Sequence, residues 1–221
     1  MILVFYVPVP KPNEHSRLIN VAAKAVLQPL GFQQKGRSRV WFADRGFWAP
    51  VIEFQPSGYS KGSYLNIAAM WLWHPGNGWA FNYFQRAGRF IVFETIEQFG
   101  PRAEKLADLA AAEATALDKK FESSAAIAHY LKEQANDERL DKNPWTLYHA
   151  AIAAGLTGDQ AFSQKCFDAL IAQNPTVDWM REMQAEAATL AKLRIESGEF
   201  NAAIRKKVAG TRAALKLQPL E

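Results

Sequence analysis

Near the middle of its N-terminal half, the chain reads Tyr64-Leu65-Asn66-Ile67-Ala68-Ala69-Met70-Trp71-Leu72-Trp73. Because successive side chains of an extended strand point to opposite faces, the odd-numbered and even-numbered residues of this run form two separate surfaces. Both surfaces are largely apolar, which is typical of a strand covered on both sides. The run therefore predicts a central strand, with a helix on one face and either C-terminal helices or a second subunit on the other.

Turn residues divide the neighbouring sequence into further extended segments. These segments cover about residues 38–44, 48–57, 63–73, 79–85 and 89–94, and short runs rich in Gly, Pro, Asn and Asp separate them. Connections this short join antiparallel neighbours, so the pattern predicts a meander. Upstream, a helix is predicted between Asn13 and Pro29. Its apolar residues recur at helical spacing and should face the core: Leu18, Val21, Ala22, Ala25 and Val26.

The second half of the chain has a different composition. From Pro101 onward it is rich in Ala, Leu, Glu and Lys, which favour helix, and capping residues and prolines divide it into about six helices, the first starting at Pro101. We therefore predict an α+β fold in two parts. Residues 1–100 form an α+β domain whose N-terminal helix packs on an antiparallel meander sheet. Residues 101–221 form an all-α helical-hairpin region packed against it.

Composition excludes several classes of protein. With 49% hydrophobic and 22% charged residues among 221, the chain is globular rather than disordered. A single cysteine, Cys166, excludes intramolecular disulfides and multi-cysteine zinc sites, so we expect a reducing compartment, the cytoplasm. The apolar start, residues 2–7, lacks the features of a signal peptide and is too short to span a membrane. We predict that it forms a first β-strand.

Several motifs in the first half resemble a known family. A helix ends in Leu27-Gln28-Pro29-Leu30-Gly31-Phe32-Gln33-Gln34-Lys35-Gly36-Arg37, and Trp41-Phe42, Phe54-Gln55-Pro56-Ser57 and Tyr64-Leu65-Asn66-Ile67 follow. Over residues 15–95 this set resembles the bacterial domain-of-unknown-function family forty-three-oh-four. The resemblance implies a helix packed on an antiparallel sheet and no established activity. It suggests a role in binding, including toxin–immunity pairs.

The segment from Trp145 to Pro175 is similar to one tetratricopeptide unit, a helical hairpin with small residues where the helices touch. A single unit cannot bury its own faces, so a true array needs partners on both sides. The flanking sequence does not repeat the pattern. A generic helical bundle is therefore the competing interpretation.

Polar residues interrupt two predicted neighbouring strands at matching positions. Pairing Gln55 with Asn66 places Glu53, Gln55, Ser57 and Asn66 on one polar strip, whereas a slip by one residue would mix polar with apolar side chains. The strip has two interpretations. It forms a groove for a ligand or peptide, including the pocket of an enzyme, or it is a polar network whose members satisfy one another.

Basic residues alternate before the first aromatic strand. An extended backbone would place Lys35, Arg37 and Arg39 on one side, followed by Trp41. Such a group can hold phosphate and stack on a base, which suggests a nucleic-acid site; a solvated strand edge is the other interpretation. The net charge is only +4, with about 10 Lys and Arg against 5 Asp and Glu in residues 1–100. This modest excess disfavours nucleic-acid binding.

Signatures of catalysis and metal binding are missing from the sequence. There is no phosphate loop, dinucleotide fingerprint or Gly-x-Ser-x-Gly elbow, and His15, His74, His129 and His149 lack the spacing of a metal pair. We interpret His149 as a packed helix residue and Cys166 as a small core residue. We therefore predict a non-catalytic binding protein without cofactor, metal or membrane association, whose partner is another protein. An enzyme using Glu53, Gln55 and Asn66 and a nucleic-acid-binding protein are the alternatives.

Overall fold

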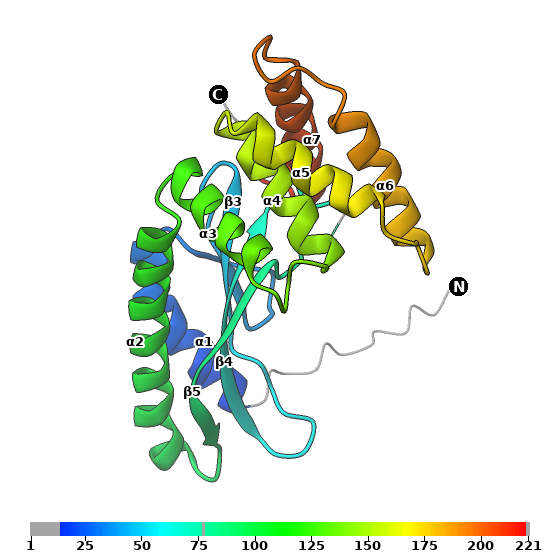
Figure 1. Cartoon of the computed structure of the whole chain (residues 1–221). Coiled ribbons are helices and arrows are strands. Elements are labelled where there is room, and N and C mark those ends of the chain that lie inside the picture. Colours follow the sequence, from blue (N-terminus) through cyan, green and yellow to red (C-terminus); the bar gives the residue numbers. More distant parts are fainter. Residues whose placement is uncertain (1–13, 77, 220–221) are drawn as a thin grey trace, which may run out of the picture. The chain divides into compact units, whose positions relative to one another are not determined.

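The computed structural model describes residues 14–76 and 78–219. Helix α1 (Glu14–Leu27) and a short 3-10 turn, η1 (Gln28–Leu30), lead into five strands: β1 (Gln33–Gln34), β2 (Val40–Phe42), β3 (Trp48–Glu53), β4 (Gly62–Trp71) and β5 (Tyr83–Val92). The helices that follow are α2 (Ile96–Lys120), α3 (Ser124–Asn136), α4 (Pro144–Leu156), α5 (Gln160–Ile171), α6 (Asp178–Leu190) and α7 (Glu199–Leu215) (Figure 1). The strand predicted over residues 2–7 lies outside the described residues.

The five strands form one antiparallel sheet in the order β1-β2-β3-β4-β5. Sequential strands are neighbours, which confirms the predicted meander and the α+β class. The register pairs Gln33 with Phe42 between β1 and β2, and Val40 with Glu53 between β2 and β3. Short connections of this kind need no crossover and give a simple up-and-down sheet.

The break predicted at Ala87-Gly88 is wrong, because β5 continues through it. Gly88 adopts a φ of 67°, a conformation that L side chains rarely take, and a Cβ there would lie 3.0 Å from the side chain of Leu109 on α2. The glycine therefore marks a local distortion of a continuous strand where a helix packs closely on it.

Strand β4 is buried along nearly its whole length, as its two apolar faces predicted. Leu65 and Trp71 on one face and Met70 on the other have no exposed surface, and Leu72 just beyond the strand is equally buried. Because side chains on both faces are buried, neither face of this segment is open to solvent. The prediction that this segment is covered on both faces is confirmed.

Helix α1 buries a different side from the predicted one. Its buried residues are His15, Ile19, Ala23 and Leu27. The residues expected to face the core lie about 100° around the helix from these, and Val21 among them is 60% exposed. Both sides are apolar, so the spacing alone could not choose between them. The structure selects the side on which the His15 ring contacts the rings of Phe93 and Phe99, at 5.5 and 6.3 Å between centroids.

Helix α2 begins at Ile96, five residues before Pro101, which corrects the predicted helix start. The hydroxyl of Thr95 accepts a hydrogen bond from the backbone N–H of Gln98 at 3.2 Å, so Thr95 acts as the N-terminal cap. The predicted domain boundary at Gly100-Pro101 therefore falls inside a helix.

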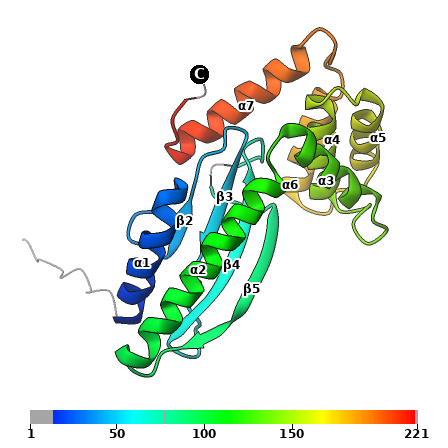
Figure 2. The ribbon, with the colours of Figure 1, turned by 90° about the vertical axis from the view of Figure 1, so that its left-hand side faces the viewer.

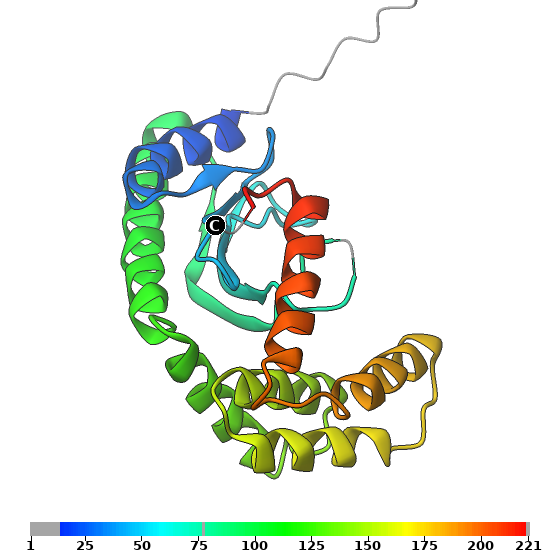
Figure 3. The same cartoon turned by 90° about the horizontal axis from the view of Figure 1, so that it is seen from above.

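The chain divides into two compact units, and each combines segments distant in sequence. The first contains residues 14–43 together with Val51–Ala68 and Phe84–Ala114. In this unit α1 and the first part of α2 lie beside each other on one face of the strands (Figure 2 and Figure 3). The second contains the described residues of Asp44–Pro50, Ala69–Tyr83 and 115–219. Short pieces of the sheet region thus belong to the same unit as the C-terminal helices.

Helix α4 is central to the second unit. Residues 147–155 of α4 are all buried, and the helix packs against α3, α5, α6 and α7. Gly155 allows the closest approach, because a Cβ there would lie 2.5 Å from the ring of Phe200 on α7. Helices α4 and α5 form the hairpin expected between Trp145 and Pro175, while its assignment to a tetratricopeptide array stays a prediction. Within the described residues no helix has the length and apolar character needed to cross a bilayer.

Candidate functional site

Two histidines that are far apart in the sequence meet in the second unit. His74 follows β4, and His149 lies in the middle of α4, where its side chain is only 3% exposed. Asn82, just before β5, lies against both imidazole rings. Because α4 is buried on all sides, a polar residue at its centre must find hydrogen-bond partners inside the protein.

The tautomer of His149 follows from its contact with Trp73. The indole Nε1–H of Trp73 donates to Nδ1 of His149 at 3.1 Å. Since an indole nitrogen only donates, Nδ1 of His149 must be the unprotonated acceptor, and the neutral ring then carries its proton on Nε2. Nε2 lies 3.4 Å from Nδ1 of His74, toward which it can donate.

The backbone fixes the orientation of the Asn82 side chain. Its Oδ1 accepts the backbone N–H of Trp71 at 2.9 Å, which turns Nδ2 toward the histidines. Nδ2 donates to Nδ1 of His74 at 2.9 Å, and its 3.2 Å approach to Nε2 of His149 is a contact between two donors. His74 therefore accepts at Nδ1 and, when neutral, carries its proton on Nε2.

Both imidazoles are held in the neutral form. Burial, and after it the charge of Lys207, lowers the pKa of His74 from its ordinary value of 6.5 to about 4. Burial, followed by the neighbouring His74 and Lys207, lowers the pKa of His149 well below its ordinary value. The hydrogen-bond pattern has the same effect, because a proton on Nδ1 of His74 would face the donor groups of Asn82 and His149.

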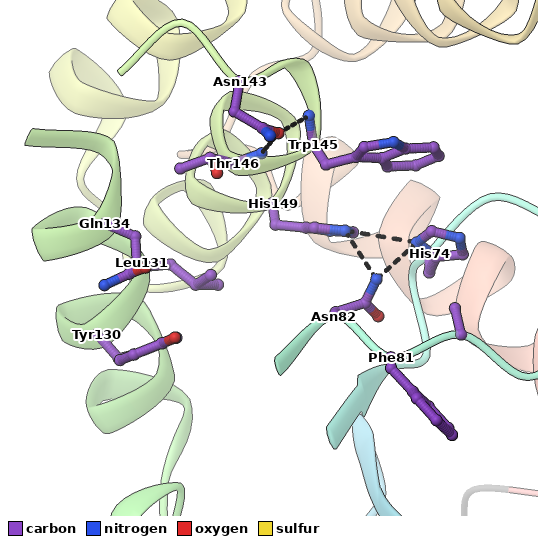
Figure 4. Close-up of a pocket in the computed structure, with 11 residues that line it drawn as sticks. His74, Phe81, Asn82, Tyr130, Leu131, Gln134, Asn143, Trp145, Thr146 and His149 are labelled. Carbon is purple, nitrogen blue, oxygen red and sulfur yellow. Dashed lines mark hydrogen bonds between the residues drawn. The ribbon is translucent and has the colours of Figure 1, made fainter. Parts of the chain in front are cut away.

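These residues line one side of a cavity of about 290 Å³. Figure 4 shows Tyr130 and Leu131 on α3 facing Asn82 and His149 across it. The cavity lining consists of His74, Ala80, Phe81, Asn82, Tyr130, Leu131, Gln134, Asn143, Trp145, Thr146 and His149. It contains aromatic rings, amides and hydroxyls but no carboxylate, ammonium or guanidinium group.

Three polar side chains of the lining make no hydrogen bond to the described part of the chain: the Tyr130 hydroxyl, the Gln134 amide and the Thr146 hydroxyl. Burial raises the pKa of Tyr130 to about 12, so its hydroxyl remains a donor at neutral pH. By contrast, Oδ1 of Asn143 caps α4 by accepting the N–H groups of Trp145 and Thr146, at 2.9 and 3.1 Å. Unpaired donors and acceptors in a cavity are available to a ligand.

An aromatic column leads from the cavity toward the surface of the same unit. The ring of His74 stacks on Trp145 with 4.6 Å between centroids, and Trp145 stacks on Trp179 at 5.1 Å. Trp179 is 43% exposed. The stacking holds Trp145 in a fixed orientation at the cavity wall.

The polar strip predicted from the sequence is present in the first unit, as a hydrogen-bonded network. Nδ2 of Asn66 donates to Oε2 of Glu53 at 2.8 Å and to Oε1 of Gln55 at 3.0 Å. Arg86, which the sequence analysis did not include, donates to Oδ1 of Asn66 at 3.2 Å and to Oε1 of Gln55 at 2.7 Å. Ser57 lies apart and accepts the backbone N–H of Tyr59. This arrangement favours the network interpretation over an open groove.

The predicted row of basic residues is not formed, because the chain turns where an extended backbone was expected. The backbone N–H of Lys35 bonds to the carbonyl of Val40 at 2.9 Å, and Arg37 lies exposed in the turn between β1 and β2. Arg39 is buried and donates to the Ser16 hydroxyl and the Gly62 carbonyl. Trp41 is 2% exposed, so its ring is not presented to a base.

Sequence reasoning missed the imidazole pair as a site. It interpreted His149 as a packed helix residue, and burial supports that part of the interpretation. The available signal was a histidine and a tryptophan, His149 and Trp145, one turn apart on an otherwise apolar helix. Nothing in the sequence connected them with His74 or Asn82.

Among residues 14–76 and 78–219, no three His, Cys, Asp or Glu side chains gather in a way that could hold a metal ion. Cys166 is buried, and burial raises the pKa of its thiol to about 11. No family model matches the chain, and neither the curated proteins nor the solved structures contain a match. The resemblance of residues 15–95 to family forty-three-oh-four therefore stays a prediction.

Proposed function

We propose that this chain is a non-catalytic binding protein that takes a small, uncharged molecule with a planar ring into the His74–His149 cavity. The observation that carries this proposal is the combination of three unpaired polar side chains with an uncharged aromatic lining. The volume of about 290 Å³ lies at the lower end of the range for ligand pockets. It suits a molecule of one or two rings.

The chemistry of the lining favours a neutral ligand. An anion buried here would meet no cation in the lining, and a cation would meet no carboxylate, so either would lose its hydration without a compensating charge. A ring amide or lactam, in contrast, can exchange hydrogen bonds with Tyr130, Gln134 and Thr146 while its face contacts the ring of Trp145.

The protonation states support binding rather than acid–base catalysis. A general acid or base works best with a pKa near the working pH, whereas the pKa of His74 is about 4 and that of His149 is lower than normal. The indole of Trp73 already occupies Nδ1 of His149. Both rings therefore serve as neutral hydrogen-bonding groups that shape the cavity.

Matched pairs of rings that differ only in charge test this function. We expect saturation-transfer NMR on the full chain to detect benzamide, nicotinamide or uracil, and to give weaker signals with benzoate, nicotinate and orotate. The Tyr130→Phe and Gln134→Leu variants should weaken binding by about 5- to 30-fold each, which corresponds to one lost hydrogen bond.

His129→Gln is the matched control, because His129 lies on the same helix but its side chain is 76% exposed. Binding that survives both cavity substitutions, or a consistent preference for the anions, would contradict the proposed site.

A protein partner is the second proposed function, and the exposed aliphatic and aromatic surface around α6 favours it. Val177 and Trp179 are 41% and 43% exposed beside the Trp145 stack. Aromatic anchors of this kind are enriched in protein interfaces. Capture of a partner by the wild-type chain but not by Trp179→Ala would support this function. A single cysteine is consistent with the cytoplasmic location that we propose.

A further inference from the structure

Helix α1 carries a second apolar side that the described residues cover only in part. While His15, Ile19, Ala23 and Leu27 are buried, the outward side presents Val21 and Ala25, which are exposed, and Leu18, Ala22 and Val26, which are half-buried. Val21 at its centre is 60% exposed. A continuous apolar strip that is partly exposed, unlike a single exposed residue, can serve as an interaction surface.

Two hollows follow this outward side, and Val21 and Ala25 line both of them. The first, of about 290 Å³, lies between α1 and α2 and is bounded on its α2 side by Gly100, Glu104 and Asp108. The second, of about 500 Å³, lies along α1 and adds Lys24, Gln28 and Pro29. The apolar strip therefore has two carboxylates along one flank and an ammonium group along the other.

These charges have no partners within the described residues. Lys24, Glu104 and Asp108 form no ion pair or side-chain hydrogen bond there. A patch with a positive flank, an apolar centre and a negative flank is complementary to a copy of itself in a suitable orientation.

We propose that the outward side of α1 is the contact surface of a homodimer, with a second copy of this chain as its occupant. The two-fold axis runs parallel to α1 and lies in the interface, next to the exposed side chain of Val21. Rotation about it places the negative flank of one copy opposite the positive flank of the other. Lys24 of each copy then faces Glu104 or Asp108 of the other, with the apolar strips in contact between them. The small side chains of Ala22 and Ala25 let the two helices approach closely.

The charge pattern also selects this axis over the other way of pairing the same surfaces. A two-fold axis perpendicular to α1 within the interface would keep the flanks on the same side and place Lys24 opposite Lys24. Like charges opposed at an interface disfavour association. The dimer therefore has its α1 helices side by side and pointing in the same direction.

Sedimentation velocity of the full chain across a concentration series up to about 1 mM tests the proposal. We expect a monomer–dimer equilibrium for the wild type. Lys24→Glu or Glu104→Lys should raise the dissociation constant by about tenfold or more, because the two-fold symmetry doubles each like-charge contact. The double variant Lys24→Glu/Glu104→Lys restores opposite charges and should dimerise again.

Arg102→Glu on the far flank of α2 reverses a charge in the same way as Lys24→Glu and should leave the dimer intact. The three substituted positions, Lys24, Arg102 and Glu104, are all exposed, so circular dichroism should show folded chains throughout. A wild-type chain that stays monomeric over the whole series overturns the proposal. So does a dimer that Lys24→Glu and Glu104→Lys leave unchanged, or one that the double variant fails to restore.

Discussion

Trp73 and His149 are 76 residues apart in the sequence, yet the indole Nε1–H of Trp73 donates to Nδ1 of His149 at 3.1 Å. This single bond assigns the tautomer of a buried imidazole and thereby the roles of His74 and Asn82 around it. It also connects the end of the central apolar strand with the middle of α4 inside one compact unit.

Replacing Trp73 tests this contact, and Trp71 is its matched control. The two indoles are both buried and stack at 5.8 Å, but Nε1 of Trp71 has no partner in the described part of the chain. We expect Trp73→Phe to lower the free energy of unfolding by about 1–3 kcal/mol more than Trp71→Phe, because it leaves His149 with an unsatisfied buried acceptor. Urea unfolding gives both values. Equal losses would show that the bond contributes nothing beyond packing.

The neutral imidazoles make stability depend on pH in a defined window. In the unfolded chain a histidine takes up its proton near pH 6.5, whereas folded His74 does so only near pH 4. The unfolded state therefore binds more protons between these values, and stability falls as the pH drops from about 6.5 to 4.

Substitution of His74 isolates its share of this effect. Between pH 7 and pH 4, the free energy of unfolding of His74→Gln should fall by about 1–2 kcal/mol less than that of the wild type. This value allows for solvent screening of a partly exposed ring. His129→Gln, which replaces a histidine whose side chain is 76% exposed, is the control substitution. Urea unfolding at each pH gives the free energy of unfolding. If this quantity changes with pH equally in the wild type and in His74→Gln, His74 is not held neutral in the folded state.

Two arginine–carboxylate pairs of the second unit should differ in their effect on stability. Arg212 is 3% exposed and donates to both oxygens of Asp44, while Arg45 pairs with Asp118 and both of these side chains remain about 30% exposed. We expect Asp44→Ala to lower the free energy of unfolding by about 3 kcal/mol, because the buried guanidinium of Arg212 loses its carboxylate partner. Asp118→Ala should lower it by about 1 kcal/mol or less. Chemical denaturation of the two variants measures the difference. A larger loss of stability in Asp118→Ala than in Asp44→Ala would contradict the expected order of the two pairs.

The network around Asn66 should tolerate no second carboxylate. Asn66→Asp removes the donor to Glu53 and Gln55 and places two carboxylates within about 3 Å of each other, a distance at which both resist ionisation together. We expect a loss of about 2 kcal/mol at neutral pH that shrinks as the pH falls. Ser57→Ala, at the same strip in the sequence but outside the network, should change stability by less than about 0.5 kcal/mol. A loss that does not vary with pH would exclude charge repulsion as its cause.

The sequence predicted the class of fold because the deciding patterns are local. The alternation of apolar residues from Tyr64 to Trp73, the short turns and the helix caps each depend on a few neighbouring residues. The polar strip was accessible for the same reason. Asn66 lies only 11 and 13 residues from its partners Gln55 and Glu53, on the next strand along the chain.

Failures of local prediction arose where two local choices were equally good. Either side of α1 offers an apolar stripe, and tertiary contacts such as those of His15 with Phe93 and Phe99 decide between them. Likewise, alternation suggested that Lys35, Arg37 and Arg39 share one side, but the hairpin between β1 and β2 turns the chain at that point.

The sequence by itself thus determined the antiparallel meander, the C-terminal helices and the pairing of Asn66 with Glu53 and Gln55, since hydrophobic periodicity and short-range pairing specify them. Tertiary structure alone decided the cavity. His74, Asn82, His149 and Tyr130 come from segments separated by up to 75 residues, and no local rule relates such segments. Their meeting depends on how buried α4 packs, and the low pKa of both histidines then follows from that burial.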